Sequence, residues 1–244
     1  MISGDVAISA GTRARLDPSV LAEVKASLWR VDCQSCGLSL GTAQAALAID
    51  QAGESGWASL HHLRCREPGW TSSNVVALNP AFQSHRSLFV LLPVHDLSAP
   101  AGRENVLPVM IVNPALECVP LTGAGERLQV QLEKDFTAAG LAPPGQGVLQ
   151  DPAPGASASL TAASAAVTVR TRPNIVYQSW LDGDDVQNAQ MRRVITSQGG
   201  ILLAVSHLVD PAAIDDVSRQ LEDAIRTGRL LLGWAALTGP EGRP

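Results

Sequence analysis

The chain has 244 residues, of which 45% are apolar, and it carries a formal net charge of −5 with a pI near 5.5. This is enough for one large or two small domains with a buried core, and the acidic balance argues against general binding to phosphate backbones or anionic lipid. No apolar run approaches the roughly 18 residues that a membrane-spanning helix needs, so we expect no membrane partner. Sixteen arginines against two lysines, with abundant alanine, glycine and proline, indicate a GC-rich and therefore bacterial genome.

The first part of the chain contains one clear helix signal. Residues 1–15 are predicted to form a strand or an arm, and they lack the basic and apolar segments of a secretion signal. Asp17 and Pro18 then mark a helix start, because a carboxylate caps the first turn and proline fits the first helical position. We expect that helix to end near Ser27 and residues 28–31 to form a strand.

Four residues in two pairs form the strongest motif. Cys33 and Cys36, followed by Gly37, have the form of a zinc knuckle, because two thiolates on one tight turn can reach one ion and glycine lets the backbone bend beneath them. With 25 residues between Cys36 and His62, a His-x2-Cys pair follows that ends at Cys65. Both pairs can converge on one tetrahedral ion.

The histidine ligand has two candidates, since His61 also forms a His-x3-Cys pair with the same cysteine. We prefer His62, because its spacing mirrors that of the first pair. Three thiolates and one imidazole suit Zn2+, and four protein ligands leave no position for water, so the predicted zinc site is structural. Cys33 and Cys36 could instead form a disulfide or a redox pair, or the four residues could be unconnected, but nothing indicates an oxidising compartment. We therefore expect a reducing, cytoplasmic location.

The residues between the two pairs are predicted to form a hairpin. Two short apolar runs, 45–50 and 57–63, flank the turn-rich segment 51–56. A hairpin brings its two ends together, so it would carry His62 and Cys65 back to the first cysteine pair.

The pattern over residues 33–65 resembles C2HC zinc fingers, including those of the poly(ADP-ribose) polymerase type, which also use Cys-x2-Cys and then His-x2-Cys. The resemblance implies the ligand set Cys33, Cys36, His62 and Cys65. Fingers of that type bind DNA breaks through basic surfaces, whereas residues 28–72 here contain three arginines against four acidic residues. The resemblance therefore supports the ligand set and not DNA binding.

From residue 87 the sequence becomes rich in strand signals. The apolar runs 88–92 and 106–112 are predicted buried strands, and 117–121 pairs with 127–133 in a predicted hairpin, because Leu128, Val130 and Leu132 alternate with polar residues. Together these segments predict an antiparallel meander. Cys118, which lies apart from the other cysteines, is interpreted as a buried strand thiol.

The last hundred residues alternate strands with helices. The Ala/Ser/Pro-rich stretch at about 143–166 is predicted to be loop or linker. Strands are expected at 167–170, 174–180, 201–205 and 230–234, and helices at 184–198 and from Asp210-Pro211 to Gly228. The second helix is predicted to bury one stripe made by Ile214, Val217, Leu221 and Ile225.

The sequence thus predicts an α+β protein in two parts. The first is an N-terminal segment, 1–80, with a small zinc-binding β-hairpin module centred on 28–72. The second is an antiparallel β-rich domain, 85–244, that ends in helices.

No phosphate-binding loop, nucleophile elbow or His-Glu-x2-His pattern occurs, so no catalytic residue is predicted. We expect a bacterial cytosolic binding or adaptor protein with a structural zinc and a protein partner, in an oligomeric state that the sequence leaves open.

Two alternative functions use other residues. His62, Asn74 and His85 resemble in order the residues of an HNH nuclease, in which histidine activates water and asparagine orients it. Arg64, Arg66 and Arg86 could instead form a local basic patch of a nucleic-acid-binding regulator.

Overall fold

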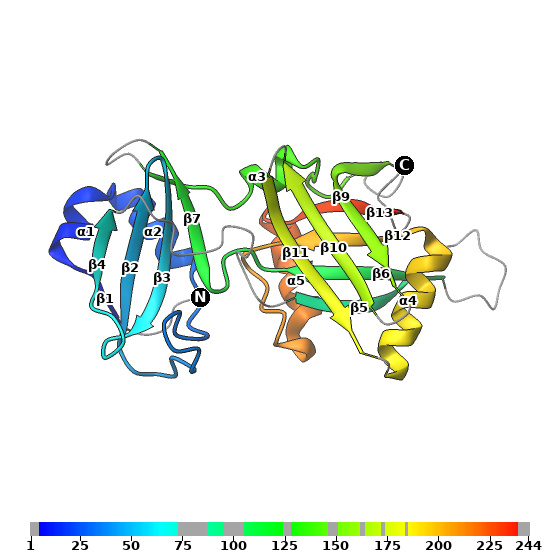
Figure 1. Cartoon of the computed structure of the whole chain (residues 1–244), viewed down its shortest axis with the longest axis horizontal. Helices are drawn as coiled ribbons and strands as arrows, with labels where there is room; N and C mark the ends of the chain where they lie inside the picture. Colours follow the sequence, from blue (N-terminus) through cyan, green and yellow to red (C-terminus); the bar gives the residue numbers. More distant parts are fainter. Residues whose placement is uncertain are drawn as a thin grey trace. The chain divides into compact units, whose positions relative to one another are not determined.

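The computed structural model describes residues 5–72, 87–94, 105–123, 128–145, 151–161, 164–171, 174–183 and 185–238. The chain forms two compact units, Met1–His85 with Asn113–Lys134 and Arg86–Val112 with Asp135–Pro244. Each unit has its own sheet and its own core, and the mixture of two strand-rich sheets with helices is broadly α+β, as predicted (Figure 1).

The sheet of the first unit has the order β1-β2-β3-β7-β8, and β4 also pairs with β2. Its strands are β1 (Val6–Ala7), β2 (Ala45–Ala52), β3 (Ser55–His62), β4 (Gly69–Ser72), β7 (Cys118–Thr122) and β8 (Gln129–Val130). β2 and β3 are antiparallel over their whole length, from Ala45 opposite His62 to Ala52 opposite Ser55. The predicted hairpin at 45–63 is therefore present.

Two helices pack on this sheet, α1 (Ala10–Arg15) and α2 (Pro18–Ser27). The predicted cap of α2 is confirmed, since Asp17 accepts a hydrogen bond of 2.8 Å from the backbone N–H of Ser19. Two nearby expectations are wrong in part. The segment 1–15 contains α1 as well as a two-residue strand, and residues 28–31 form no regular strand.

The core of the first unit lies between these helices and the sheet. It is made of aliphatic side chains from α2, β2, β3, β7 and the segment before β8, with Val24, Leu47, Ile49, Leu60, Val119, Leu121 and Leu128 all at most 2% exposed.

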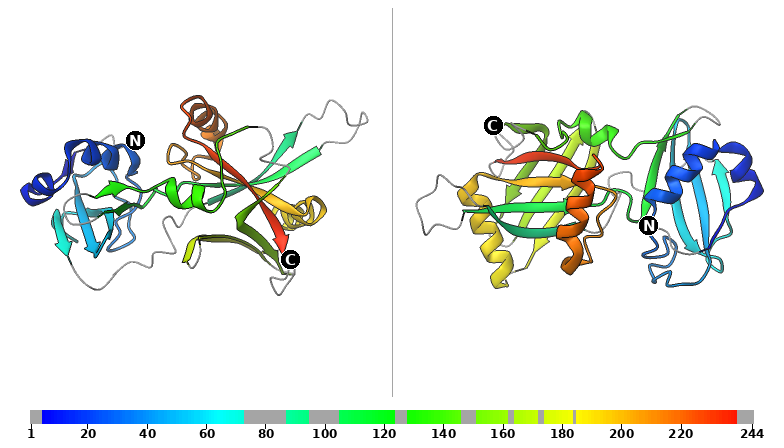
Figure 2. Two further views of the ribbon diagram at one scale, coloured as in Figure 1. Left: turned by 90° about the horizontal axis from the view of Figure 1, so that it is seen from above. Right: turned by 180° about the vertical axis from the view of Figure 1, so that it is seen from behind.

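The second unit is built on one seven-stranded sheet with the order β11-β10-β9-β13-β12-β6-β5. Its strands are β5 (Ser87–Val94), β6 (Asn105–Val112), β9 (Pro152–Leu160), β10 (Ser164–Thr171), β11 (Asn174–Asp182), β12 (Gly200–Val205) and β13 (Leu231–Thr238). The pairs β12–β6 and β13–β9 are parallel and the others are antiparallel. The sheet curls so far that its two outermost strands meet, and Ser87 of β5 and Ser179 of β11 share a 2.7 Å hydrogen bond (Figures 1 and 2).

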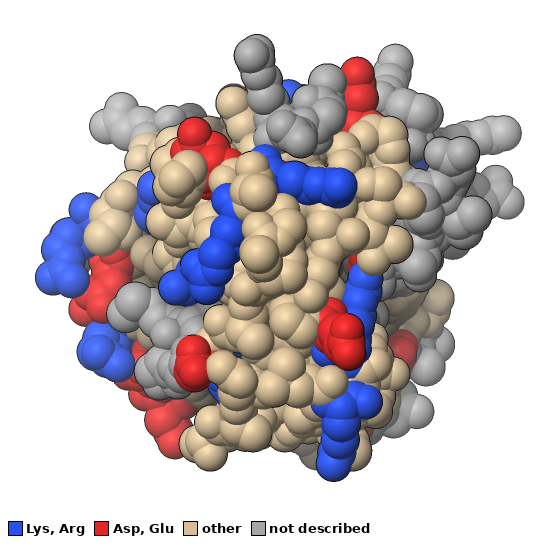
Figure 3. All heavy atoms as spheres, turned by 90° about the vertical axis from the view of Figure 1, so that its left-hand side faces the viewer, with Lys and Arg blue, Asp and Glu red and all other residues tan. Residues whose placement is uncertain are grey.

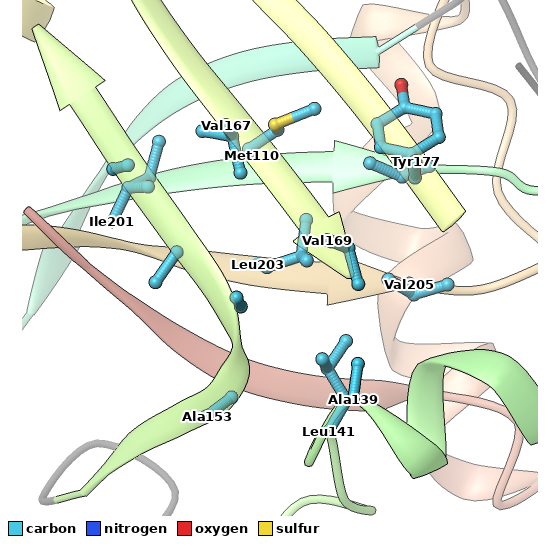
Figure 4. Close-up of a cluster of buried hydrophobic side chains, with 14 of the residues drawn as sticks. Met110, Ala139, Leu141, Ala153, Val167, Val169, Tyr177, Ile201, Leu203 and Val205 are labelled. Atoms are coloured by element: carbon cyan, nitrogen blue, oxygen red, sulfur yellow. The ribbon is translucent and has the colours of Figure 1, made fainter. Parts of the chain in front are cut away.

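Apolar side chains fill the inside of the curled sheet. Val167 and Val169 of β10 face Met110 of β6 and Leu203 of β12, and Tyr177 of β11 lies beside them (Figure 4). The helices α3 (Lys134–Ala138) and α4 (Val186–Gln198) add Phe136, Met191 and Ile195 to the same core. On the other face of β6 and β12, Val217 and Ala224 of α5 (Val217–Arg226) pack on Val109, Ile111 and Leu202.

The Ala/Ser-rich part of 143–166 is not a loop, because β9 and the start of β10 occupy most of it. Its small side chains have a packing reason. A Cβ on Gly155 would lie 2.3 Å from the backbone oxygen of Arg170, and Ala156 and Ala158 are buried inside the sheet. Small residues here let neighbouring segments of backbone approach one another closely. The same composition, taken alone, predicts a linker.

The last helix begins later than predicted. Asp210 accepts a 2.9 Å hydrogen bond from the N–H of Ala212 in a turn, and a 3-10 segment, η1 (Ile214–Asp216), precedes α5. The predicted apolar stripe is wrong at both ends, since Ile214 is 66% exposed and Ile225 is 53% exposed.

The predicted meander does not form, because β5 and β6 belong to one sheet whereas β7 and β8 belong to the other. The strand β7 therefore lies in the first unit, although the sequence placed it beyond residue 85 in the second domain. In the described part of the chain, no helix is both long and apolar enough to cross a membrane.

Candidate metal centre

The first cysteine pair lies on a tight turn just after α2. The N–H of Gly37 donates to the backbone oxygen of Cys33 at 2.8 Å, and the N–H of Cys33 donates to that of Leu38 at 2.9 Å. Gly37 has a φ of +70°, in the left-handed region that glycine adopts most easily. The turn rests on β3, because the N–H of Gln34 donates to the backbone oxygen of Leu60 at 3.1 Å. This is the bend predicted for a knuckle.

The second pair lies at the end of β3. His62 is the last residue of the strand, and its backbone oxygen accepts hydrogen bonds from the N–H groups of Cys65 at 2.9 Å and Arg66 at 3.1 Å. The chain therefore turns back at once, and the side chain of Cys65 returns toward the histidine.

The two turns bring four possible ligands together. The sulfur atoms of Cys33, Cys36 and Cys65 and a ring nitrogen of His62 all lie within 4.8 Å of one another. Nδ1 of His62 is 3.4 Å from Sγ of Cys36 and 4.0 Å from Sγ of Cys65. The arrangement is the one expected if the four side chains share one ion.

The ring of His62 is oriented for a metal at Nδ1. Its Nε2 lies 3.1 Å from the backbone oxygen of Ser39, which can only accept a hydrogen bond, so Nε2 carries the proton and Nδ1 presents its lone pair to the sulfurs. Histidines that bind a metal commonly donate their other ring N–H in this way. Arg30 holds the same loop in place by donating to the backbone oxygens of Gly41 and Ala43.

His61, the alternative candidate, is not part of the cluster. It is 3% exposed, and its Nδ1 and Nε2 lie 2.9 Å from the hydroxyls of Ser35 and Ser59. Burial, and then the charge of Arg66, lower the pKa of His61 to about 4, although Asp50 acts in the opposite direction. His61 is thus a neutral buried residue with both ring nitrogens in hydrogen bonds.

The electrostatics of the cysteines suit a cation. Burial raises the pKa of Cys33, but N–H groups of His62, Ser35 and Cys36 outweigh it and bring that pKa to about 6. The N–H of His62 lies 3.3 Å from the Cys33 sulfur. Desolvation raises the pKa of Cys65, hydrogen bonds of its thiol to the sulfurs of Cys36 and Cys33 raise it further, and charge repulsion by these two cysteines adds to the effect. A divalent cation would remove that repulsion.

The donor set fits zinc. Three soft sulfur donors and one correctly oriented imidazole make up the four ligands of a closed tetrahedral site. Two residues around the cluster could not have been indicated by a motif, because Ser39 contributes only its backbone oxygen and Arg30 donates only to the backbone oxygens of neighbouring segments.

An ion pair holds the second turn against the sheet. Arg66 donates to both carboxylate oxygens of Asp50 in β2, one of them at 2.7 Å, and also to the hydroxyl of Thr71 in β4 at 3.3 Å. The hydrogen bond to Asp50 raises the pKa of the Arg66 guanidinium. The residue after Cys65 is therefore fixed to two strands.

The remaining candidate residues lie elsewhere. Cys118 is a buried thiol of β7, as predicted, and burial, with a smaller effect of Glu117, raises its pKa to about 12. Asn74, His85 and Arg86, which the nuclease and regulator alternatives require, lie outside the described residues. On the face shown in Figure 3, the described Lys and Arg side chains alternate with uncharged and acidic ones.

Comparison with known proteins found no match for this chain among family models, curated proteins or solved structures. The fold and the site therefore define it only as a two-unit α+β protein with a cluster of three cysteines and one histidine that could hold a metal ion.

Proposed function

We propose that this is a bacterial cytosolic binding or adaptor protein whose first unit contains a structural Zn2+ bound by Cys33, Cys36, His62 and Cys65. The observation that carries the proposal is the convergence of these four ligand atoms within 4.8 Å. Four protein ligands complete a tetrahedral site, so the ion would have no open position for substrate or water.

The two turns also need a cross-link. The tips of the turns contribute little apolar surface to the core, since Leu38 is 59% exposed and Leu63 is 42% exposed, whereas Cys33 at the start of the first turn is buried in it. Without burial to hold them, loops of this kind are ordered by a metal, and in zinc-finger peptides the ion contributes on the order of 10 kcal/mol of folding free energy.

We propose a binding role because the sequence contains the four metal ligands but no catalytic motif. The proposed partner is another protein. We expect a tagged wild-type protein to co-purify a partner from its native cells, and His62→Gln to recover less of that partner because weaker zinc binding leaves the turns less well ordered. If both proteins recovered the partner equally, partner binding would not depend on the metal centre.

Adjacent histidines provide a matched test of the metal site itself. The wild type should contain one zinc per chain by elemental analysis. His62→Gln removes one of four ligands. If each ligand contributes a quarter of the metal's folding free energy of roughly 10 kcal/mol, the variant should bind zinc more weakly by a factor on the order of 100. His61→Gln changes only hydrogen bonds to Ser35 and Ser59, so its zinc affinity should stay within about tenfold of the wild type. Absence of zinc from the wild type, or equal loss in the two variants, would refute the assignment.

A further inference from the structure

The four side chains of the cluster differ sharply in their access to solvent. Cys33 is 1% exposed, whereas Cys36 and Cys65 are exposed. The buried sulfur also accepts a hydrogen bond from the N–H of His62 at 3.3 Å. Any soluble reagent therefore meets Cys36 and Cys65 first.

The two exposed sulfurs come from different turns and lie side by side. Cys36 belongs to the turn after α2 and Cys65 to the turn after β3, and their Sγ atoms are within 4.8 Å of each other. All cysteines are free thiols in the structure. Exposed cysteines that lie next to a second cysteine are readily oxidised to a disulfide.

We propose that Cys36 and Cys65 form a peroxide-sensitive pair that opens the metal centre, an inference that rests on the proposed zinc site. The thiolate of Cys36 attacks hydrogen peroxide, the O–O bond breaks, hydroxide leaves and Cys36 becomes a sulfenic acid. The thiolate of Cys65 then attacks that sulfur, an S–S bond forms and a second hydroxide leaves. Two sulfurs lose two electrons, and the peroxide gains them.

The disulfide replaces the zinc ion as the link between the two turns. Only Cys33 and His62 remain as donors, and two ligands hold zinc far more weakly than four, so the ion is released. The covalent bond keeps the two turns together, which allows reduction to restore the original ligand set. The site would therefore report oxidants by a reversible exchange of zinc for a disulfide.

The test uses the full zinc-loaded chain treated with hydrogen peroxide in small stoichiometric steps. A chromophoric chelator measures released zinc, and alkylation followed by peptide mapping with tandem mass spectrometry locates the disulfide. We expect about one equivalent of zinc per disulfide, a Cys36–Cys65 bond, an alkylated Cys33 and recovery of zinc binding after reduction. The control variant Cys118→Ala removes a buried thiol that is not part of the cluster. It should release zinc at a rate within about twofold of the wild type.

Three outcomes would overturn the inference. These are cysteine oxidation with zinc retained, a disulfide that joins Cys33 to Cys36, and zinc release only under conditions that unfold the chain by circular dichroism. Purified protein without zinc, before any peroxide is added, would instead overturn the proposed function.

Discussion

Replacement of Asp50 by asparagine should destabilise the first unit, although Asp50 is not one of the four candidate ligands. Its carboxylate receives two hydrogen bonds from Arg66, the residue that follows Cys65. Asparagine keeps the shape of the side chain but removes its charge, so the guanidinium is left beside a neutral amide.

The exposure of the two side chains sets the expected magnitude. Arg66 keeps 27% and Asp50 keeps 21% of their side-chain surface exposed. Breaking a fully buried ion pair costs about 3–5 kcal/mol and an exposed pair is worth about 0–1 kcal/mol, so this two-point pair should contribute about 1–2 kcal/mol. A unit of about 100 residues loses roughly 4–8 °C of Tm per kcal/mol, which gives a decrease on the order of 10 °C.

The assay is thermal unfolding of zinc-loaded protein followed by circular dichroism. The matched control is Asp216→Asn, which breaks another two-point Arg–Asp pair, with Arg219, whose side chain is 70% exposed. The control should lower Tm by less, because solvent screens that pair more strongly. A Tm for Asp50→Asn that equals the wild type, or a decrease no larger than that of the control, would refute the claim that Arg66 holds the second turn to the sheet.

Two further predictions concern packing and pH. Gly155→Ala should lower the free energy of unfolding in urea by about 1–3 kcal/mol, because the added Cβ would clash with the backbone oxygen of Arg170. In the control Gly145→Ala the nearest neighbour of the added Cβ is 3.8 Å away, so the free energy of unfolding should change little. Equal urea midpoints for the two variants would contradict this. Because the pKa of Cys118 is raised from about 9 to about 12, the native protein keeps a proton that the unfolded chain releases. Stability should therefore be insensitive to this thiol below pH 9 and fall by up to about 1.4 kcal/mol per pH unit as pH rises from 9 toward 12, a slope that Cys118→Ala should remove.

Local signals in the sequence were sufficient for several elements. Asp17 and Pro18 specify the start of α2, and Asp185 with Gly199 brackets α4, because caps depend on residues that are near in the chain. The cluster was predictable for the same reason, since each ligand pair lies within a short turn and the β2–β3 hairpin brings the pairs together.

Long-range relations could not be predicted in this way. Nothing local assigns β6 and β7 to different sheets, and the choice between His61 and His62 depends on which ring faces the sulfurs. Asp210 with Pro211 has the composition of a helix start, but the hydrogen bond to Ala212 uses its carboxylate in a turn. The missed strand β9 did carry a signal, the alternation of buried Ala156 and Ala158 with polar residues, but its Ala/Ser composition is also typical of a linker.

X-ray absorption at the zinc edge of the purified wild-type protein is the most direct measurement of the metal centre. We expect a first shell of three sulfur atoms at about 2.3 Å and one nitrogen at about 2.0 Å, with no oxygen ligand. A first shell dominated by oxygen and nitrogen, or a spectrum that His62→Gln leaves unchanged, would contradict the assignment of a closed structural site.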